Sequence, residues 1–186
     1  MLRNLLSAIG FSASRRRAAR GNLDIAQWTP ELLRRLEWRR FEELCAAYFE
    51  ALGARTGAVL VRCRPWDAYG VGIKPVRELH EAMAAANVGE GVLVTSGKFT
   101  QEARAFAAKE KIGLIDGDDL LTKIGALVPE KALALLELAT SGDFITPTCR
   151  SCAIKMVKRK STARGRPYWG CRNYPGCKNT LFVSGT

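Results

Sequence analysis

The sequence contains no apolar run long enough to cross a membrane and only one histidine among its 186 residues. A helical span needs about 20 consecutive apolar residues, so the composition excludes a protein with membrane-spanning helices. The sequence also lacks a G-x-G-x-x-G or P-loop pattern, which argues against a bound nucleotide cofactor. No secretory signal pattern is visible at the N-terminus, and we therefore expect the chain to act in the cytoplasm.

Acidic residues are missing from both ends of the chain. Residues 1–20 carry a charge of +5 and residues 147–186 carry +9, whereas residues 21–146 carry only −3. Basic segments attract polyanions such as nucleic acid. The charge distribution therefore predicts a nucleic acid as the partner and no membrane, although a merely solubilising tail is the alternative for the C-terminal end.

Strand and helix patterns alternate along residues 28–140. One helix is predicted over 29–53, where Thr29 can cap, Pro30 fits the first turn and Gly53 fits the end. Strands are predicted over 58–64, 91–97 and 112–116, and further helices over 75–89, 100–111, 117–127 and 129–140. This alternation predicts an α/β domain with parallel strands and crossover helices.

Four of the six cysteines lie in the last forty residues, as a C-x2-C pair and a C-x5-C pair separated by 18 residues. Two short ligand-bearing turns brought together by a hairpin make a zinc ribbon. We expect the two strands of this hairpin over 153–160 and 166–171. We predict a ribbon over 148–186 and a linker over 141–147 that joins it to the α/β domain. At the other end of the chain we predict a basic arm over 1–27. Its structural Zn(II) would be bound by Cys149, Cys152, Cys171 and Cys177. Two disulfides in a secreted domain are the alternative.

The residues "MVKRK", "PYWGCRNYPGC" and "KNTLFV" between 149 and 182 resemble the C-terminal four-cysteine zinc fingers of bacterial type IA DNA topoisomerases. The resemblance implies a DNA-binding module, often for single strands. Arg150 and Ala153 depart from it, since the family usually has Pro and Gly there, and Gly would ease the turn. The aromatic rings could instead pack the ribbon's small core. The expected phosphate contacts are Lys155, Lys158, Arg159, Lys160, Arg164 and Arg166, and the expected stacking residues are Tyr168 and Trp169.

Three phrases of the central domain carry a second resemblance: "FEELCAAYFEALG", "VGIKPVRELHEAM" and "GVLVTSGKFTQEARAFA" followed by "IGLIDGDDLL". Over about residues 38–125 they resemble the Mrr-like, type IV restriction endonucleases, a branch of the PD-(D/E)XK nucleases. The resemblance implies a restriction-endonuclease-like core that hydrolyses DNA phosphodiesters with Mg(II) when active. Glu42, directly after Phe41, matches the family's helical catalytic Glu.

The rest of the family's catalytic pattern is altered. Its D-G-G-x-D segment is missing, so the core is truncated, and Arg62 and Arg64 replace its Gln-x-Lys pair. The two arginines point to one face of their strand, and arginine binds phosphate but cannot ligate a cation. We therefore expect a catalytically impaired nuclease in which Arg62 and Arg64 clamp a DNA phosphate. Alternatively, the two arginines only form ion pairs with acidic neighbours. Asp67 is the alternative source of the missing catalytic carboxylate.

Three functions follow from these patterns. The first is a DNA-binding protein that contacts DNA through its ribbon, the second an active metal-dependent endonuclease in restriction or repair. The third is a protein-interaction module whose ribbon recruits a partner such as RNA polymerase or a topoisomerase. A homodimer is a further expectation, because lost strands expose a sheet edge that a second copy, or alternatively the N-terminal arm, can cover.

Overall fold

The computed structural model describes residues 25–53, 59–64, 70–161, 165 and 167–182. Arg164, Arg166, Asp67 and nearly all of the basic arm predicted over 1–27 lie outside them. None of the helices in the described residues is long and apolar enough to cross a bilayer. In chain order the elements are α1 (Pro30–Arg35), α2 (Trp38–Ala51), β1 (Val59–Arg64), α3 (Ile73–Ala86), β2 (Glu90–Thr95), α4 (Gln101–Lys109), β3 (Ile112–Ile115), α5 (Gly117–Gly125), α6 (Pro129–Thr140), β4 (Val157–Lys160), β5 (Pro167–Gly170) and β6 (Thr180–Phe182).

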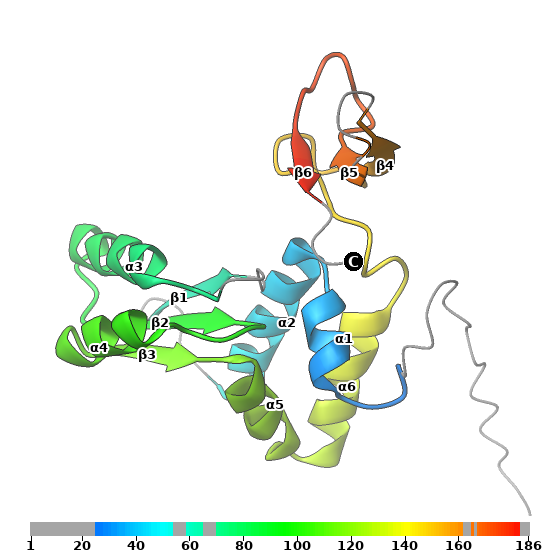
Figure 1. Cartoon of the computed structure of the whole chain (residues 1–186). Coiled ribbons are helices and arrows are strands. Elements are labelled where there is room, and N and C mark those ends of the chain that lie inside the picture. Colours follow the sequence, from blue (N-terminus) through cyan, green and yellow to red (C-terminus); the bar gives the residue numbers. More distant parts are fainter. Residues whose placement is uncertain (1–24, 54–58, 65–69, 162–164, 166, 183–186) are drawn as a thin grey trace, which may run out of the picture.

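The first three strands form a parallel sheet in the order β1-β2-β3, with α3 and α4 as its crossover connections (Figure 1). Its register pairs Arg62 with Leu93 and Cys63 with Val94. Parallel strands need such crossovers because each strand must return to the same end of the sheet. This topology confirms the α/β fold predicted from the sequence.

Helices cover both faces of this sheet. On one face α3 and α4 pack against Leu93, with Leu79 and Ala103 in the apolar cluster. On the other face α1, α2, α5 and α6 pack against Val94, with Phe41 fully buried. Successive residues of β2 enter different clusters because side chains alternate along a strand. The domain is therefore a helix–sheet–helix sandwich.

The helix predicted over 29–53 is in fact two helices, α1 and α2. Leu36 and Glu37 between them have extended backbone, with ψ values of 129° and 156°. The Glu37 N–H donates to the Phe144 carbonyl at 2.9 Å, and its carboxylate accepts from the Arg39 N–H at 3.2 Å. These bonds replace helical ones, so the chain turns at Glu37 and restarts as α2.

Helix α3 also differs from its prediction at both ends. It begins at Ile73 rather than Pro75, because Pro75 fits the first turn as well as the first position. It ends at Ala86 rather than at residue 89, and Asn87 after it takes the left-handed conformation with φ of 52°. Asn tolerates this region better than most residues.

The segment predicted as a linker over 141–147 is packed against the α/β domain. Phe144 is buried in the same cluster as α2 and α6. The Asp143 carboxylate accepts from the backbone N–H groups of Ile145 and Thr146. The connection is thus a fixed turn that leads into the C-terminal part of the chain.

Residues 148–182, which we call the ribbon, contain a second sheet of antiparallel strands in the order β4-β5-β6. It stands beside the end of the domain that carries α1 and α2 (Figure 1). β4 and β5 lie within the strands predicted over 153–160 and 166–171, and β6 was not predicted. Its three residues are too few to give a recognisable alternation.

Candidate metal centre and nucleic-acid interface

Four cysteines of the ribbon come together as predicted. Their Sγ atoms all lie within 4.8 Å of one another, and among the described residues no other such group of His, Cys, Asp or Glu occurs. The cysteines are free thiols rather than disulfides. Zn–S bonds of about 2.3 Å in a tetrahedron place sulfurs about 3.8 Å apart, and Cys149 Sγ lies 3.8 Å from Cys177 Sγ. The cluster fits a Zn(Cys)4 centre.

Two tight turns present these thiols. In the first, the Ala153 N–H donates to the Cys149 carbonyl at 2.9 Å; in the second, the Cys177 N–H donates to the Asn173 carbonyl at 2.9 Å. Asn179 adds a side-chain N–H to Cys149 Sγ at 3.6 Å. The two turns therefore present all four sulfurs at one place in the ribbon.

The thiols have unequal proton affinities. Burial raises the pKa of Cys149, but N–H donors from Cys152, Ser151 and Asn179 outweigh it and bring that pKa to about 6. Burial raises the pKa of Cys171 to about 12. A bound dication deprotonates such ligands, so metal binding releases protons.

Replacing Ala153 with glycine should stabilise the ribbon. Ala153 has φ of 54°, a left-handed conformation in which its Cβ is strained. Ala153→Gly removes that strain at some entropic cost, and we expect a gain of about 0.5–1 kcal/mol in the free energy of unfolding of the zinc-loaded protein. Urea denaturation checks it, with Ala105→Gly, at an exposed position inside α4, as the control that should lose stability. A loss of stability in Ala153→Gly would contradict the strain.

The two faces of the ribbon sheet have different roles. Lys158, Trp169 and Leu181 are paired across the three strands and share one face. Trp169 and Leu181 pack against the buried Cys149, Met156 and Cys171. Trp169 is therefore half-buried against the ribbon's core, the alternative role that the sequence left open for these rings.

The opposite face presents a row of three other residues. Arg159, Tyr168 and Phe182 are paired across the same strands, and Phe182 is 89% exposed. The Arg159 guanidinium lies over the Tyr174 ring at 5.3 Å. We call Arg159, Tyr168, Tyr174 and Phe182 the aromatic face. Sequence reasoning missed Phe182 and Tyr174, because only the register of β6 places Phe182 and only the contact with Arg159 places Tyr174.

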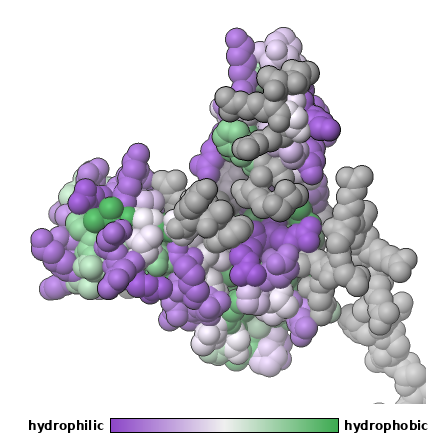
Figure 2. Space-filling view, in the orientation of Figure 1, coloured by the Kyte–Doolittle hydropathy of each residue, from purple (hydrophilic) through white to green (hydrophobic). Residues whose placement is uncertain are grey.

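The basic residues predicted to contact phosphate are placed unequally. Lys158 and Lys160 are exposed on the sheet, and Arg159 belongs to the aromatic face. Lys155 differs from its prediction, because its Nζ is bound to Glu37 at 3.1 Å. Hydrophilic residues cover much of the visible ribbon and of the surface below it (Figure 2).

The structure does not bring Glu42 and Arg62 together. Glu42 is on α2, which packs on the face of the sheet that Cys63 and Val61 enter. Arg62 is exposed on the other face, with Leu60 and Leu93. Arg64 ends β1. The one-residue offset between Arg62 and Cys63 thus decides which side chain turns towards α2.

Glu42 lies beside the ribbon instead. Partial burial raises its pKa, the Arg150 guanidinium lowers it, and Glu37 raises it further. Arg150 belongs to the C-x2-C turn and lies over the Trp38 ring at 4.7 Å. The charges around Glu42 therefore come largely from the junction with the ribbon.

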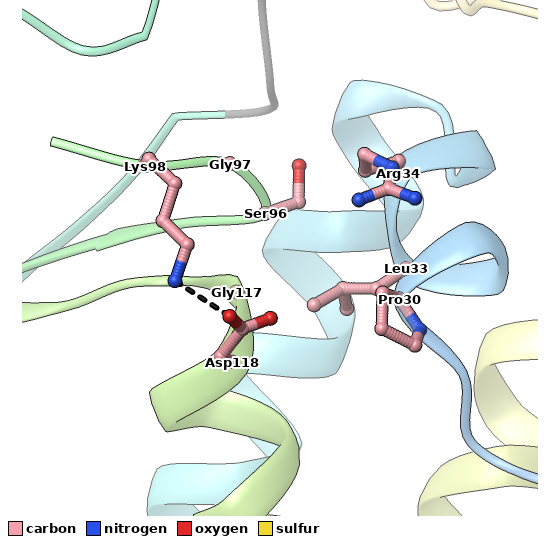
Figure 3. A pocket seen from close by; sticks show the side chains of 8 residues that line it. All are labelled: Pro30, Leu33, Arg34, Ser96, Gly97, Lys98, Gly117 and Asp118. Atoms are coloured by element: carbon pink, nitrogen blue, oxygen red, sulfur yellow. Dashed lines mark hydrogen bonds and ion pairs between the residues drawn. The ribbon is translucent and has the colours of Figure 1, made fainter.

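A small pocket opens at the carboxyl ends of β2 and β3 (Figure 3). Its volume is about 60 Å³, far below the roughly 300 Å³ of a typical small-molecule site. Lys98 crosses it to Asp118 at 2.6 Å. It is lined by Pro30, Leu33, Arg34, Ser96, Gly97, Lys98, Gly117 and Asp118.

Asp116, beside this pocket, organises the loop between β3 and α5. Its carboxylate accepts from the N–H groups of Asp118 and Asp119 at 3.1 Å, from Arg104 at 2.7 Å and from Lys98 at 3.2 Å. Burial raises the pKa of Asp116, but these donors outweigh it and lower the pKa below its usual value. Sequence reasoning missed this role, although an Asp directly before a helix with an acid three residues on signals a capping box.

Asp116→Asn should destabilise the domain by about 2 kcal/mol at pH 7. A lowered folded-state pKa gives stability that is present above the unfolded pKa of about 4 and is lost as pH falls. The difference between wild type and Asp116→Asn should therefore shrink between pH 5 and pH 3, as measured by urea denaturation. Asp118→Asn, at an exposed partner of Lys98, should change stability by less than about 0.5 kcal/mol. An equal effect at both pH values would contradict the charge role.

One comparison with known proteins concerns the central part of the chain. Residues 53–124 match the family model of the Mrr-type catalytic domain, described as a restriction endonuclease. No curated protein matches the sequence significantly. The matched range spans β1 to most of α5, so α2 with Glu42 and the whole ribbon lie outside it. A restriction-endonuclease-like domain implies a DNA partner and, for the active enzymes, Mg(II).

Proposed function

We propose that the chain is a DNA-binding protein that combines a catalytically impaired, Mrr-like (type IV) restriction endonuclease domain with a four-cysteine zinc ribbon, and that the ribbon makes the main DNA contacts. The observation that carries this proposal is the aromatic face. One face of the ribbon sheet packs on the cysteine cluster, and its opposite face presents aromatic rings and a guanidinium. Such rings stack on unpaired bases, and neighbouring cations bind phosphates.

The charge of the ribbon supports DNA contact. Residues 147–186 contain nine basic and no acidic residues. The four cysteines support a zinc finger of the topoisomerase type, because sulfur spacing and turns fit a tetrahedral centre. Since thiolate ligands stay reduced there and DNA is present, we expect the protein to act in the cytoplasm.

The arrangement around Glu42 supports impaired catalysis. Mg(II) is held by several oxygen ligands. Burial is the main cause that raises the pKa of Glu42, and the charged groups that act on it are Arg150 and Glu37, whose carboxylate is already bonded to Thr148. Arg62, where the family has the Gln of its Gln-x-Lys pair, is a cation on the opposite face of the sheet. Arg62 and Arg64 remain the proposed phosphate clamp.

Binding to duplex DNA should weaken steeply with salt. If six of the nine C-terminal basic residues meet phosphates, the slope of log K against log salt should be roughly −5. Fluorescence anisotropy with the zinc-loaded protein between 50 and 300 mM salt measures it. Affinity that does not respond to salt would contradict DNA binding, and a specific protein complex in its place would favour the interaction module.

The family match favours an active endonuclease as the second candidate. A plasmid assay distinguishes this candidate from the impaired DNA-binding protein. Methylated and unmethylated plasmid is incubated with the protein and Mg(II), Mn(II) or EDTA. Metal-dependent nicking that Glu42→Ala abolishes would establish a live nuclease. Intact plasmid in every lane, with a mobility shift, would support binding without chemistry.

A homodimer is also proposed, through the edge of the parallel sheet. Among the described strands, β1 pairs only with β2, and its other edge is open to a second copy. Light scattering tests it against the 20.4 kDa of one chain.

A further inference from the structure

The ribbon is joined to the α/β domain by a buried carboxylate, that of Glu37. Its side chain is only 3% exposed. Oε1 accepts from Thr148 Oγ1 at 3.0 Å and from Lys155 Nζ at 3.1 Å, and Oε2 accepts from the Thr148 N–H and the Arg39 N–H, both at 3.2 Å. Three of these four bonds come from the ribbon and the fourth caps α2.

Trp38, the next residue, adds two contacts to the same place. Its Nε1–H donates to the Thr148 carbonyl at 2.6 Å, and Arg150 lies over its ring at 4.7 Å. We call Glu37, Trp38, Thr148, Arg150 and Lys155 the Glu37 junction. Both sides of it are short segments, so a shift of either segment breaks several bonds at once.

The ribbon side of the Glu37 junction is part of the first ligand turn. Thr148 directly precedes Cys149, Arg150 lies between Cys149 and Cys152, and Lys155 follows three residues later. The Cys149 N–H donates to the Ile154 carbonyl at 2.8 Å, and Thr148 bridges to Lys155 across the turn. The conformation that gathers the thiols is therefore the one that offers the donors to Glu37.

Glu37 depends on these donors. A buried carboxylate that loses its hydrogen-bond partners bears a desolvation penalty, or must draw in water. If the ligand turn loosens, the Glu37 carboxylate keeps only its bond to the Arg39 N–H. The neighbouring bond from the Glu37 N–H to the Phe144 carbonyl is then no longer held in place by the ribbon. The first turn of α2 is the part of the domain that would loosen with it.

We propose that metal binding by the ribbon and the stability of the start of α2 form one coupled equilibrium, transmitted through Glu37. The coupling does not require that the ribbon bind DNA, so it stands or falls apart from the proposed function. By linkage the coupling acts in both directions. Bound metal stabilises the start of α2, and an intact Glu37 junction raises the affinity of the ribbon for the metal.

Hydrogen exchange tests the first direction on the full chain. Zinc-loaded protein and protein treated with a zinc chelator are compared at peptides covering 38–44, 144–150 and, as the remote control, 101–109. Chelation should speed exchange roughly tenfold or more at 38–44 and 144–150 while α4 stays unchanged. Faster exchange confined to the ribbon would overturn the proposal. An equal rise in all three peptides would also overturn it, because it would report general unfolding.

Zinc affinity tests the second direction. Lys155→Met keeps the aliphatic stem but removes the charge that Glu37 binds, and should weaken Zn(II) binding roughly tenfold in competition with a chelating dye. Lys178→Met, at an exposed lysine of the ribbon, is the matched control and should stay within about twofold. Equal affinities for the two variants would overturn the proposal, as would a Glu37→Gln variant that binds zinc as the wild type does.

Discussion

One zinc ion should bind per chain with an apparent Kd of about 10⁻⁸ M or tighter, and Cys171→Ser should abolish this binding. The reason is the size of the ribbon's own core. Its buried apolar side chains are Cys149, Met156 and Cys171, with Trp169 and Leu181 only partly buried against them. These few apolar contacts cannot offset the conformational entropy that is lost when the segment becomes ordered. Metal binding therefore has to supply the remaining folding free energy.

Native mass spectrometry gives the stoichiometry. Near-ultraviolet circular dichroism reports the packing of Trp169 when the spectrum of a Trp169→Phe variant is subtracted, because the chain has four tryptophans. Cys45→Ala is the matched control, since Cys45 is buried in the α/β domain and outside the cluster. It should keep one zinc ion, whereas Cys171→Ser should lose both the zinc and the fixed Trp169 environment. A Cys171→Ser protein with full zinc and an unchanged spectrum would contradict the four-cysteine site.

The cysteine cluster could be predicted from the sequence because its information is local. Each ligand pair lies within one short turn, and only one pairing of turns has to be assumed. The α/β topology was similarly accessible, since the strand and helix patterns alternate and parallel strands restrict the connections. Thr100 is a further local signal, since a threonine directly before a helical pattern is a typical cap, and its Oγ1 accepts from the Ala103 N–H.

What could not be predicted depends on partners far away in the chain. Glu37 lies in an unbroken helical pattern, and its decisive partner Thr148 is 111 residues away. The roles of Tyr168 and Trp169 depend on register: adjacent residues of a strand point to opposite faces, and only the position of the cysteine cluster decides which face is inside. In β1 the same alternation of side chains places Arg62 and Cys63 on opposite faces of the parallel sheet.

Removing rings from the aromatic face should weaken binding to single-stranded DNA more than any change on the inner face. Stacking contributes about 1–3 kcal/mol per base, so Tyr168→Ala and Phe182→Ala should each reduce affinity by roughly ten- to a hundredfold. Phe182→Leu keeps apolar bulk without a ring and should behave like Phe182→Ala. The paired position of Tyr168 and Phe182 on adjacent strands lets two successive bases stack side by side.

Anisotropy with labelled oligothymidine at fixed salt measures these affinities, with the zinc content of every variant checked first. Trp169→Ala is the discriminating comparison, because Trp169 packs on the cysteine cluster. It should lower the thermal stability of the ribbon, and protein that retains zinc should bind oligothymidine nearly as well as the wild type. Normal affinity in Tyr168→Ala and Phe182→Ala, beside a large loss in zinc-loaded Trp169→Ala, would assign stacking to the inner face and reverse the proposed interface.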